Sequence, residues 1–292
     1  MTEIASARLD GRFCVITGAT GGLGLAMADA LARRGARVML IGRDVGRLER
    51  AAAQVASRVQ AADAAPLTHL ADLATAAGVA GLVRTLRELD IPIDVLMNNA
   101  GAIFPDYGVT IDGIERTFAL NHLAAFHLTA GVFELLRCAP AARVITTSSD
   151  AHRAARPPYD DWQSATGYKP MRAYARSKLA NVLFTTALAR RLGTTSITAN
   201  CFHPGVVRTQ FSTGTRGLLR LVFTLGTPFM RSAERGAATG VYLASAPELA
   251  GMTGRYFVDE RPKSPSAAAR DERLADSLWR TSEQAAGVTL PA

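Results

Sequence analysis

Short apolar runs alternate with longer amphipathic stretches along most of the chain. The short runs are rich in strand-forming residues, whereas in the longer stretches apolar residues recur every three to four positions, the period of a helix packed on a core. Strands that alternate with helices favour parallel pairing, because a parallel connection needs a crossover helix. We therefore expect a doubly wound α/β fold, a parallel seven-stranded sheet with helices on both faces. The expected strands are 13–16, 37–41, 66–70, 93–97, 143–147, 195–202 and 254–258.

The amphipathic stretches give the expected helices. One of them carries Asn121 in its interior, where asparagine is unfavourable because its side chain competes for backbone hydrogen bonds. That position predicts either a kink or a polar role. The expected helices are 25–34, 44–60, 74–89, 110–137, 174–191, 232–246 and 267–283.

No change in composition divides the chain, so residues 1–292 are predicted to form a single domain. Two regions, 150–170 and 213–232, are expected to be loops that shape a substrate pocket, and 262–292 is expected to be a C-terminal helical tail. Residues 214–230 also carry an apolar stripe at helical spacing. This stripe could pack on the core, form a lid over a lipophilic pocket or contact a membrane surface, and the sequence leaves all three interpretations open.

Composition narrows the functional classes. The chain is 48% hydrophobic and carries a net charge of +8. Its arginines are scattered and not interleaved with aromatic residues, so we expect no nucleic-acid partner. We find no signal peptide and no run of eighteen apolar residues, which predicts a cytoplasmic protein without a transmembrane segment. Cys14, Cys138 and Cys201 lack the paired spacing of a zinc site, so they are expected to be free thiols, and no metal is expected.

A glycine-rich turn follows the first expected strand. Residues 17–24 read Thr-Gly-Ala-Thr-Gly-Gly-Leu-Gly and lead directly into a helix. This order presents backbone N–H groups and a helix N-terminus to a phosphate. Gly18 allows the tight turn, Gly22 lets the backbone approach a pyrophosphate, and Gly24 lets the helix pack close to the strand. The turn predicts a Rossmann-type nucleotide-binding fold.

The end of the second strand indicates which dinucleotide is bound. A carboxylate here would hold the ribose 2′-hydroxyl of NAD(H), whereas an arginine accommodates the 2′-phosphate of NADP(H). The chain has Gly42 followed by Arg43, while Asp44 is expected to cap the next helix. We therefore expect NADPH or NADP to be preferred over NAD.

The ends of other expected strands supply further residues that could contact the dinucleotide. Asp72 and Leu73 follow the third strand, where an adenine edge would lie, although Asp72 could equally cap the helix that follows. Residues 98–101 read Asn-Asn-Ala-Gly, and the last two are small enough for a ribose and phosphate to pass over them. We expect Asn98 to tether neighbouring strands through its side chain. Pro204 and Gly205 form a sharp turn after the sixth strand.

Tyr174 and Lys178 are candidates for acid–base chemistry. Residues four apart on a helix leave the same face, so the ammonium can lie beside the phenol. A nearby cation favours the phenolate, so we expect the pKa of Tyr174 to be lowered towards neutrality. Ser148 and Ser149 end the fifth strand, and only one of them can face the site, because successive strand residues point to opposite sides.

With these motifs in order, the chain resembles the short-chain dehydrogenase/reductase family over almost its whole length. The resemblance rests on the glycine turn, Asn-Asn-Ala-Gly, the Tyr–Lys pair and Pro-Gly followed by Thr209. Several runs look like the retinol-dehydrogenase-like branch of this family. They are 148–152, 177–184, 203–208 and the ending around 254–257 and 269–272. Bacterial ketoreductases of polyketide tailoring look similar.

The resemblance implies a role for each matched residue. Tyr174 would be the acid/base, Lys178 would lower its pKa and hold the nicotinamide ribose, Ser149 would bind the substrate oxygen, and Asn121 would hold a relay water. The substrate would be a small lipophilic carbonyl compound or alcohol, and the protein a homodimer or homotetramer. The expected cofactor-binding residues are Gly18, Thr20, Gly22, Leu23, Gly24, Arg43, Asp72, Leu73, Asn99, Ala100, Gly101, Tyr174, Lys178, Pro204, Gly205, Val207 and Thr209.

The expected function is NADP(H)-dependent reduction, or formation, of a carbonyl on a lipophilic aldehyde or ketone. Two enzymatic alternatives are a retinol/retinal dehydrogenase and a light-driven tetrapyrrole reductase. A non-enzymatic alternative is an NADP(H)-binding sensor, which would keep the glycine turn but has no need of an acid/base pair.

Overall fold

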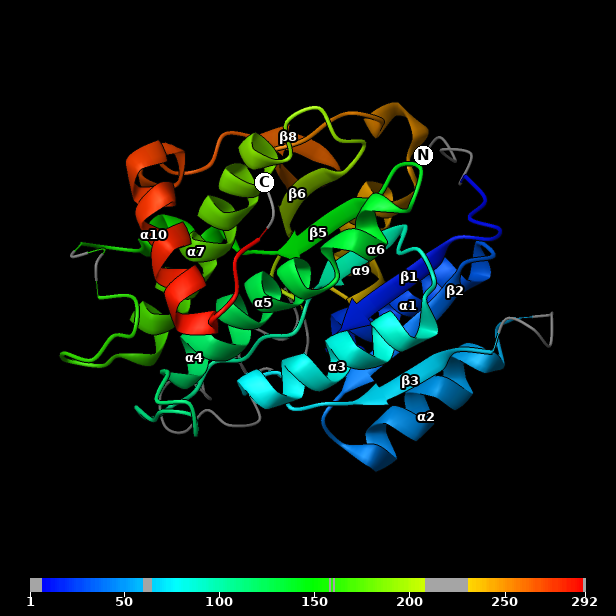
Figure 1. Ribbon diagram of the computed structural model, residues 1–292, viewed down its shortest axis with the longest axis horizontal. Coiled ribbons are helices and arrows are strands. Elements are labelled where there is room, and N and C mark those ends of the chain that lie inside the picture. The colour runs from blue at the N-terminus through cyan, green and yellow to red at the C-terminus, as the bar shows by residue number, and fades with distance from the viewer. Residues whose placement is uncertain (1–6, 60–64, 158, 160, 208–230, 291–292) are drawn as a thin grey trace.

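An eight-stranded sheet forms the centre of the computed structural model, which describes residues 7–59, 65–157, 159, 161–207 and 231–290 (Figure 1). The strand order is β3-β2-β1-β4-β5-β6-β7-β8, and every neighbouring pair from β3 to β7 is parallel. The strands are β1 (Phe13–Thr17), β2 (Arg37–Gly42), β3 (Leu67–Leu70), β4 (Val95–Asn98), β5 (Arg143–Thr147), β6 (Thr198–His203), β7 (Tyr256–Val258) and β8 (Arg261–Lys263).

The eighth strand corrects the expected seven-stranded sheet. β8 pairs antiparallel with β7 across the two residues Asp259 and Glu260, whose φ angles are 51° and 60°. Two successive positive φ angles are typical of the tight turn that closes a two-residue hairpin. Neither residue is glycine or asparagine, so the sequence lacks the usual signal for such a turn. Pro262 is tolerated in β8 because the strand lies at the sheet edge.

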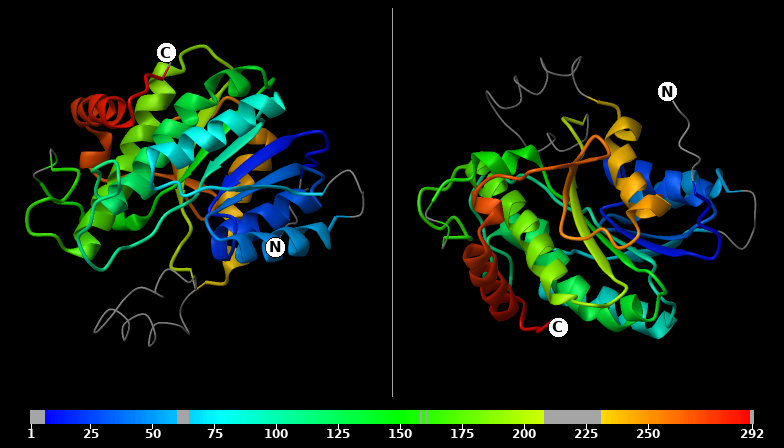
Figure 2. Two further views of the ribbon diagram at one scale, coloured as in Figure 1. Left: turned by 60° about the horizontal axis from the view of Figure 1, so that its bottom comes forward. Right: turned by 90° about the horizontal axis from the view of Figure 1, so that it is seen from above.

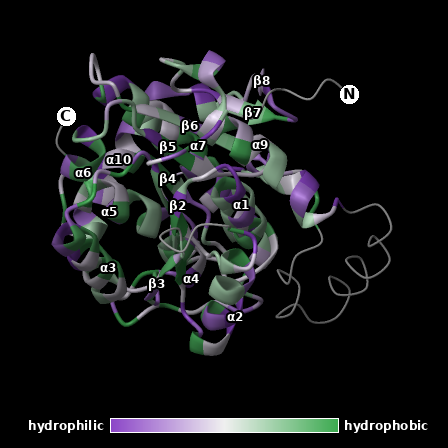
Figure 3. Ribbon diagram, turned by 90° about the vertical axis from the view of Figure 1, so that its right-hand side faces the viewer, coloured by the Kyte–Doolittle hydropathy of each residue, from purple (hydrophilic) through white to green (hydrophobic). Residues whose placement is uncertain are grey.

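Helices cover both faces of the sheet, as expected (Figure 2). α3 (Ala76–Leu89), α5 (Ala124–Gly131) and α7 (Pro170–Arg191) pack in one layer, and α1 (Gly22–Arg33), α2 (Val45–Ala56) and α9 (Ala233–Ser245) in the other. β1 contributes alternate residues to the two layers: Phe13 and Val15 to the first, Cys14 and Ile16 to the second. Figure 3 colours the same elements by hydropathy and shows both hydrophobic and hydrophilic residues in the helices around the sheet.

The helix expected over 110–137 is broken into several pieces. Residues 110–115 are not helical, because Val109 and Glu115 form an isolated antiparallel bridge. Glu115 then caps the first helical turn, accepting hydrogen bonds from the backbone N–H groups of Thr117 and Phe118, both at 2.8 Å. The pieces are α4 (Arg116–Phe118), a π-helix (Ala119–Leu123), α5 and α6 (Phe133–Arg137). The π-helix contains Asn121, so the irregularity predicted at this asparagine is confirmed.

The C-terminal segment packs against the first layer of helices. A 3-10 turn (Ala268–Arg270) leads into α10 (Glu272–Ala286), which contacts α7 and α5. Trp279 of α10 is 4% exposed, with its ring centre 5.0 Å from that of Phe126 and 6.1 Å from that of Phe184. Residues 262 and 263 of the tail predicted as helical belong to β8, and α10 within this tail completes the core.

α7 begins earlier than expected. It starts at Pro170, a favourable residue in a first turn, so Tyr174 lies in the second turn and not at the helix start. Within the described residues, no helix is both long enough and apolar enough to cross a membrane. The apolar stripe at 214–230 and Thr209 lie outside the described residues.

Candidate active site

The predicted site residues meet at the carboxyl ends of β1, β4, β5 and β6. β1 lies between β2 and β4, so the strand order reverses direction at β1 and β4. In open parallel sheets, ligands collect outside the carboxyl ends of the strands at such a switch point. The glycine turn follows β1, the Asn-Asn-Ala-Gly run follows β4, the serines follow β5, and Pro204 and Gly205 follow β6.

The glycine turn has the backbone geometry of a phosphate-binding loop. Gly18 and Gly22 have φ angles of 65° and 52°, which favour glycine. A Cβ atom on Gly24 would lie 2.3 Å from the Gly18 carbonyl oxygen, so only glycine lets α1 approach β1 this closely. α1 has no side-chain cap at Gly21 and no acidic residue in its first turn. Its N-terminal N–H groups thus suit an anion, and the turn fits a dinucleotide pyrophosphate.

Asn99 ties three strand ends together beside this turn. Its side-chain nitrogen donates to the Thr17 carbonyl oxygen at 2.9 Å, and its side-chain oxygen accepts from the Thr147 hydroxyl at 3.2 Å. The expectation that Asn98 would tether strands was therefore wrong by one residue. Asn98 instead donates to Thr129 of α5 at 3.1 Å, because neighbouring residues point to opposite faces.

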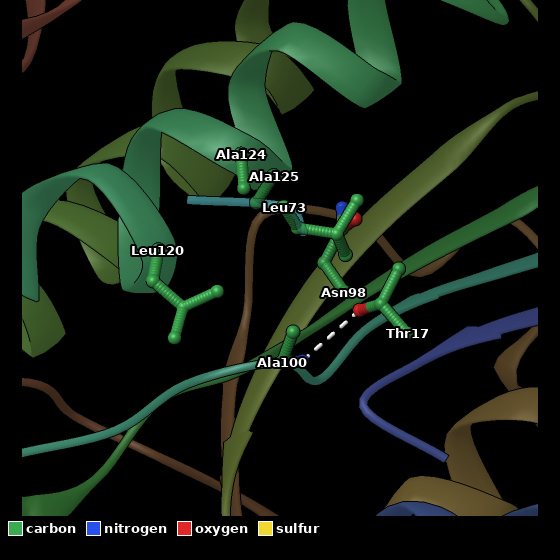
Figure 4. Close-up of a pocket in the computed structure, with 7 residues that line it drawn as sticks. All are labelled: Thr17, Leu73, Asn98, Ala100, Leu120, Ala124 and Ala125. Carbon is green, nitrogen blue, oxygen red and sulfur yellow. Dashed lines mark hydrogen bonds between the residues drawn. The ribbon is translucent and has the colours of Figure 1, made fainter. Parts of the chain in front are cut away.

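Thr17 also fixes the chain after β4. Its hydroxyl oxygen accepts from the backbone N–H groups of Asn99 and Ala100 at 2.9 and 3.0 Å. Figure 4 shows the second of these bonds beside a small cavity of about 10 Å³. Space of this size holds about one water molecule, so the ends of β1 and β4 are tightly joined here. The cavity is lined by Thr17, Leu73, Asn98, Ala100, Leu120, Ala124 and Ala125.

The end of β2 has no space for an acidic side chain. A Cβ atom on Gly42 would lie 2.1 Å from the Thr20 methyl carbon. Arg43 is exposed, and Asp44 caps α2 as predicted, accepting from the Arg47 backbone N–H at 2.8 Å. One Arg47 guanidinium nitrogen lies 3.2 Å from where a Cβ on Gly21 would be. A second arginine, which the sequence reading missed, therefore extends over the glycine turn.

The residues after β3 play different parts. Leu73 is 6% exposed and packs in the core, whereas Asp72 is exposed. The cap of α3 is Thr75, whose hydroxyl accepts from the Gly78 backbone N–H at 3.1 Å. Asp72 instead accepts from the Ala74 backbone N–H at 3.1 Å within the preceding turn. The alternative role of Asp72 as the helix cap was therefore wrong.

The two serines after β5 have different partners. Ser148 is 1% exposed and donates to the Lys178 carbonyl oxygen at 2.9 Å. Ser149 is partly exposed and hydrogen-bonds the Tyr174 phenol. The serine beside the phenol is thus the second one, and two hydroxyl groups lie together at the carboxyl end of β5.

Lys178 lies close to Tyr174 without lowering its pKa. Burial raises the pKa of Tyr174 to about 12, and the hydrogen bond with Ser149 acts in the opposite direction. The Lys178 nitrogen is 5.6 Å from the centre of the Tyr174 ring and donates to the Thr147 carbonyl oxygen at 2.9 Å. Burial lowers the pKa of this ammonium group to about 8. The expected lowering of the tyrosine pKa is therefore wrong for this structure, because burial of the phenol has the largest effect and raises its pKa.

Asn121 is held rigidly in the π-helix. Its side-chain oxygen accepts from the Ala102 backbone N–H at 2.7 Å, and its nitrogen donates to the Ala102 carbonyl at 3.0 Å and to the Ser177 hydroxyl at 2.9 Å. A Cβ on Gly101 would lie 3.1 Å from the Asn121 oxygen and 3.6 Å from the Lys178 nitrogen. Because residue 101 is glycine, the side chains of Asn121 and Lys178 can both lie close to the main chain at this position.

The turn after β6 packs against α9. Gly205 has a φ of 82°, and a Cβ there would lie 2.6 Å from the Arg231 side chain. Val207 pairs with Arg231 in an isolated parallel bridge. The Val207 side chain also lies against Gly236 of α9, since a Cβ there would be 2.5 Å from a Val207 methyl group.

A buried arginine holds the loop that precedes α7. Arg176 is 1% exposed, although it lies only two residues after Tyr174. It donates to the Asp161 carbonyl oxygen at 2.6 Å and forms an ion pair with the Asp161 carboxylate at 3.1 Å. The sequence reading missed Arg176, because arginine is rarely fully buried. The available signal was its place inside a largely apolar helix.

Comparisons with known proteins identify the family of this chain. Residues 12–217 match the family model described as short chain dehydrogenase. Human retinol dehydrogenase 14 is 38% identical over 294 residues, covering 96% of this chain and 88% of that protein. A protein of Streptomyces sp. (strain C5) that carries the name daunorubicin C-13 ketoreductase DnrU is 41% identical over 282 residues, covering 96% of this chain and 94% of that protein.

Solved structures share the fold. An uncharacterised Mycobacterium paratuberculosis protein superposes with a TM-score of 0.79 and 32% identity, covering 99% of this chain and 98% of that chain. The RhlG/NADP active-site complex of Pseudomonas aeruginosa gives a TM-score of 0.68 and 27% identity, covering 86% of this chain and 95% of that chain. The chain therefore belongs to the short-chain dehydrogenase/reductase family of oxidoreductases, in its retinol-dehydrogenase-like branch.

Proposed function

We propose that this protein is an NADP(H)-dependent oxidoreductase that reduces, or in reverse forms, a carbonyl group on a lipophilic aldehyde or ketone. One observation carries the proposal. The hydrogen-bonded hydroxyl groups of Ser149 and Tyr174 lie at the carboxyl end of β5, next to the buried ammonium of Lys178. Two adjacent hydroxyl donors suit an oxygen atom on which negative charge develops.

The residues present fit a nicotinamide dinucleotide. The open N-terminus of α1 and the glycine turn would hold the pyrophosphate, and Ala100 and Gly101 would lie beneath the neighbouring ribose. Arg43 and Arg47 would pair with a ribose 2′-phosphate, and Gly42 leaves no place for a carboxylate that would hold the 2′-hydroxyl. The related RhlG structure is a complex with NADP, which supports the same preference. When bound, the nicotinamide supplies or accepts the hydride.

The protein's own residues account for the proton transfer. A pKa of about 12 keeps Tyr174 protonated at neutral pH, so it can donate a proton to the substrate oxygen during reduction. Ser149 would donate a hydrogen bond to the same oxygen. The Asn121 side chain is already bonded to Ala102 and Ser177, so a relay water between it and Lys178 would use its backbone carbonyl in the π-helix.

The proposed substrate class rests on the names of the relatives. One relative is named a retinol dehydrogenase, and retinol is a lipophilic alcohol, while another carries the name of a daunorubicin C-13 ketoreductase, a reaction at a ketone. The loop before α7 places Trp162, which is 3% exposed, against Phe118, with ring centres 6.4 Å apart. Trp162 therefore anchors the loop before α7 to the hydrophobic core.

The test follows NADPH consumption across lipophilic aldehydes, aromatic ketones and polycyclic ketones, and repeats the panel with NADH. We expect turnover with at least one class and a preference for NADPH. Tyr174→Phe should still bind NADPH, while its turnover should fall by about 10²-fold or more, in the usual range for a positioned acid/base group. Wild-type turnover in Tyr174→Phe would refute the assigned chemistry. NADPH binding without turnover of any substrate would favour the sensor.

A further inference from the structure

His152 lies three residues after Ser149, and it is only 1% exposed. It belongs to a short 3-10 turn (Asp150–Ala154) that begins immediately after the serine. Ser149 caps this turn, since its hydroxyl oxygen accepts from the Ala151 backbone N–H at 3.2 Å. The position of the serine hydroxyl therefore depends on the position of the turn.

The His152 ring joins two backbone groups that lie far apart in the sequence. Its Nδ1 is 2.7 Å from the Ser149 carbonyl oxygen, and its Nε2 is 3.1 Å from the Ser266 backbone nitrogen. A carbonyl oxygen can only accept and a backbone N–H can only donate. Nδ1 must therefore carry the proton, and Nε2 must accept from Ser266. Both partners fix the same neutral tautomer, and burial favours the neutral ring by lowering the pKa of His152.

The segment on the other side of this ring is well anchored. Arg153 donates to the Ser264 carbonyl oxygen at 2.7 Å, and the Ser266 hydroxyl oxygen accepts from the Ala269 backbone N–H at 3.3 Å. The His152 ring also packs edge-on against Tyr256 of β7, with ring centres 4.9 Å apart. Two successive residues of the turn thus hold the segment between β8 and the turn before α10.

We propose that His152 is a positioning residue that holds the Ser149 main chain through Nδ1 and links it, through Nε2, to the segment between β8 and α10. The proposal rests on the proposed function, in which Ser149 binds the substrate oxygen. A shift of about 1 Å in a group that contacts the reacting atoms can cost about 10²-fold in rate. Loss of the ring should therefore lower kcat, with little change in carbonyl KM or NADPH binding.

Two substitutions test the hydrogen bonds of Nδ1 and Nε2 separately. An asparagine amide nitrogen can take the place of Nδ1, so His152→Asn keeps a donor for the Ser149 carbonyl. A glutamine amide extends to the place of Nε2, so His152→Gln keeps the acceptor for Ser266 and loses the donor at Ser149. We expect His152→Gln to lower kcat by about 10- to 100-fold and His152→Asn to lower it by less than about 5-fold. His127→Gln, a half-buried histidine of α5, is the control and should leave kcat unchanged.

A double-mutant cycle distinguishes positioning from general damage. If His152 acts through the serine hydroxyl, His152→Gln should cause no further loss of kcat in a Ser149→Ala background. An equal loss in both backgrounds, or a wild-type kcat in His152→Gln, would overturn the proposal. A wild-type kcat in Ser149→Ala would instead remove the serine from the proposed function, and the positioning role with it.

The link to the C-terminal segment has its own test. Ser266→Pro removes the backbone N–H while leaving His152 in place. We expect a smaller loss of kcat in the same direction, with NADPH affinity retained as the sign of a folded protein. An unchanged kcat in Ser266→Pro would overturn the link to the segment between β8 and α10.

Discussion

The Lys178 ammonium group donates a hydrogen bond to the Thr147 carbonyl oxygen at 2.9 Å, so the lysine is anchored to the carboxyl end of β5. Its side chain is otherwise enclosed, with 2% of the residue exposed. The same strand end presents Ser149, and the same helix presents Tyr174. A charged group is thus fixed between the sheet and α7, where removal from water disfavours its charged form.

Reduction should slow as the pH rises through about 8. Burial lowers the pKa of Lys178 to about 8, while that of Tyr174 is raised to about 12, so the lysine loses its proton first. Loss of the ammonium charge removes a cation beside the developing oxyanion. We expect kcat/KM for reduction, measured between pH 6 and pH 10 at saturating NADPH, to fall along a single limb near pH 8. If kcat/KM for reduction does not change up to pH 9, the charge of Lys178 has no role in the reaction.

The same burial predicts that Lys178→Met folds more stably than the wild type near neutral pH. The folded-state pKa lies below the unfolded value, so the unfolded chain binds more protons, and stability rises as the pH increases from about 8 towards 10.5. A shift of this size corresponds to about 3 kcal/mol, an order-of-magnitude figure. At pH 7, the free energy of unfolding of Lys178→Met, measured in urea, should exceed that of the wild type by part of this amount. The variant should also lose turnover. Lys263→Met on exposed β8 is the control and should change neither quantity.

Arg43 and Arg47 should control NADPH affinity together. We expect Arg43→Asp to weaken NADPH binding far more than NADH binding, since only NADPH carries the 2′-phosphate. Arg47→Ala should act in the same direction, because its guanidinium extends over Gly21. The measurement is the Kd of each dinucleotide by fluorescence titration, with Arg50→Ala, on the same helix, as the matched control. Equal effects on the two dinucleotides would contradict the assignment.

Gly42→Asp alone should not convert the protein to NADH. Its Cβ would clash with Thr20, so we expect weaker binding of both dinucleotides. Combining it with Thr20→Gly, which removes the clashing methyl group, should restore NADH binding in preference to NADPH. Tight NADH binding by Gly42→Asp alone would show that the turn can move aside.

The sequence predicted the parallel part of the sheet, and it placed the candidate site residues at strand ends, because strand ends and glycine turns depend on local chemistry. The phosphate turn after β1 and the cap at Asp44 could be read from neighbouring residues. The tyrosine pKa could not, because it depends on burial by elements distant in the sequence. The tether after β4 was misplaced by one residue, since a strand pattern alone does not say which of Asn98 and Asn99 faces its neighbours. β8 was missed because the second turn position, where φ is 60°, holds Glu260 and not the usual glycine.

Arg176→Leu should loosen the substrate loop without affecting NADPH. The Arg176 guanidinium group donates to the carbonyl and carboxylate oxygens of Asp161. It also donates to the Ser164 hydroxyl oxygen at 3.3 Å, and the backbone of Ser164 has a φ angle of 50°. The loop before α7 would lose these anchors. We expect carbonyl KM to rise by about 10-fold, as expected for loss of about 1.4 kcal/mol of binding, while the NADPH Kd stays unchanged. Arg84→Leu, at an exposed arginine of α3, is the control. A change confined to NADPH affinity would contradict this role.

Trp279→Ala should destabilise the whole protein and not only detach α10. The indole ring packs against Phe126 and Phe184, and Arg191 lies over it at 4.2 Å. Removing a buried tryptophan typically costs about 3–5 kcal/mol, because the cavity adds to the lost transfer energy. We expect a single urea transition with a lower midpoint, and Trp279→Phe should recover most of the loss. Two separate transitions, with the second at the wild-type midpoint, would show instead that α10 unfolds independently of the sheet.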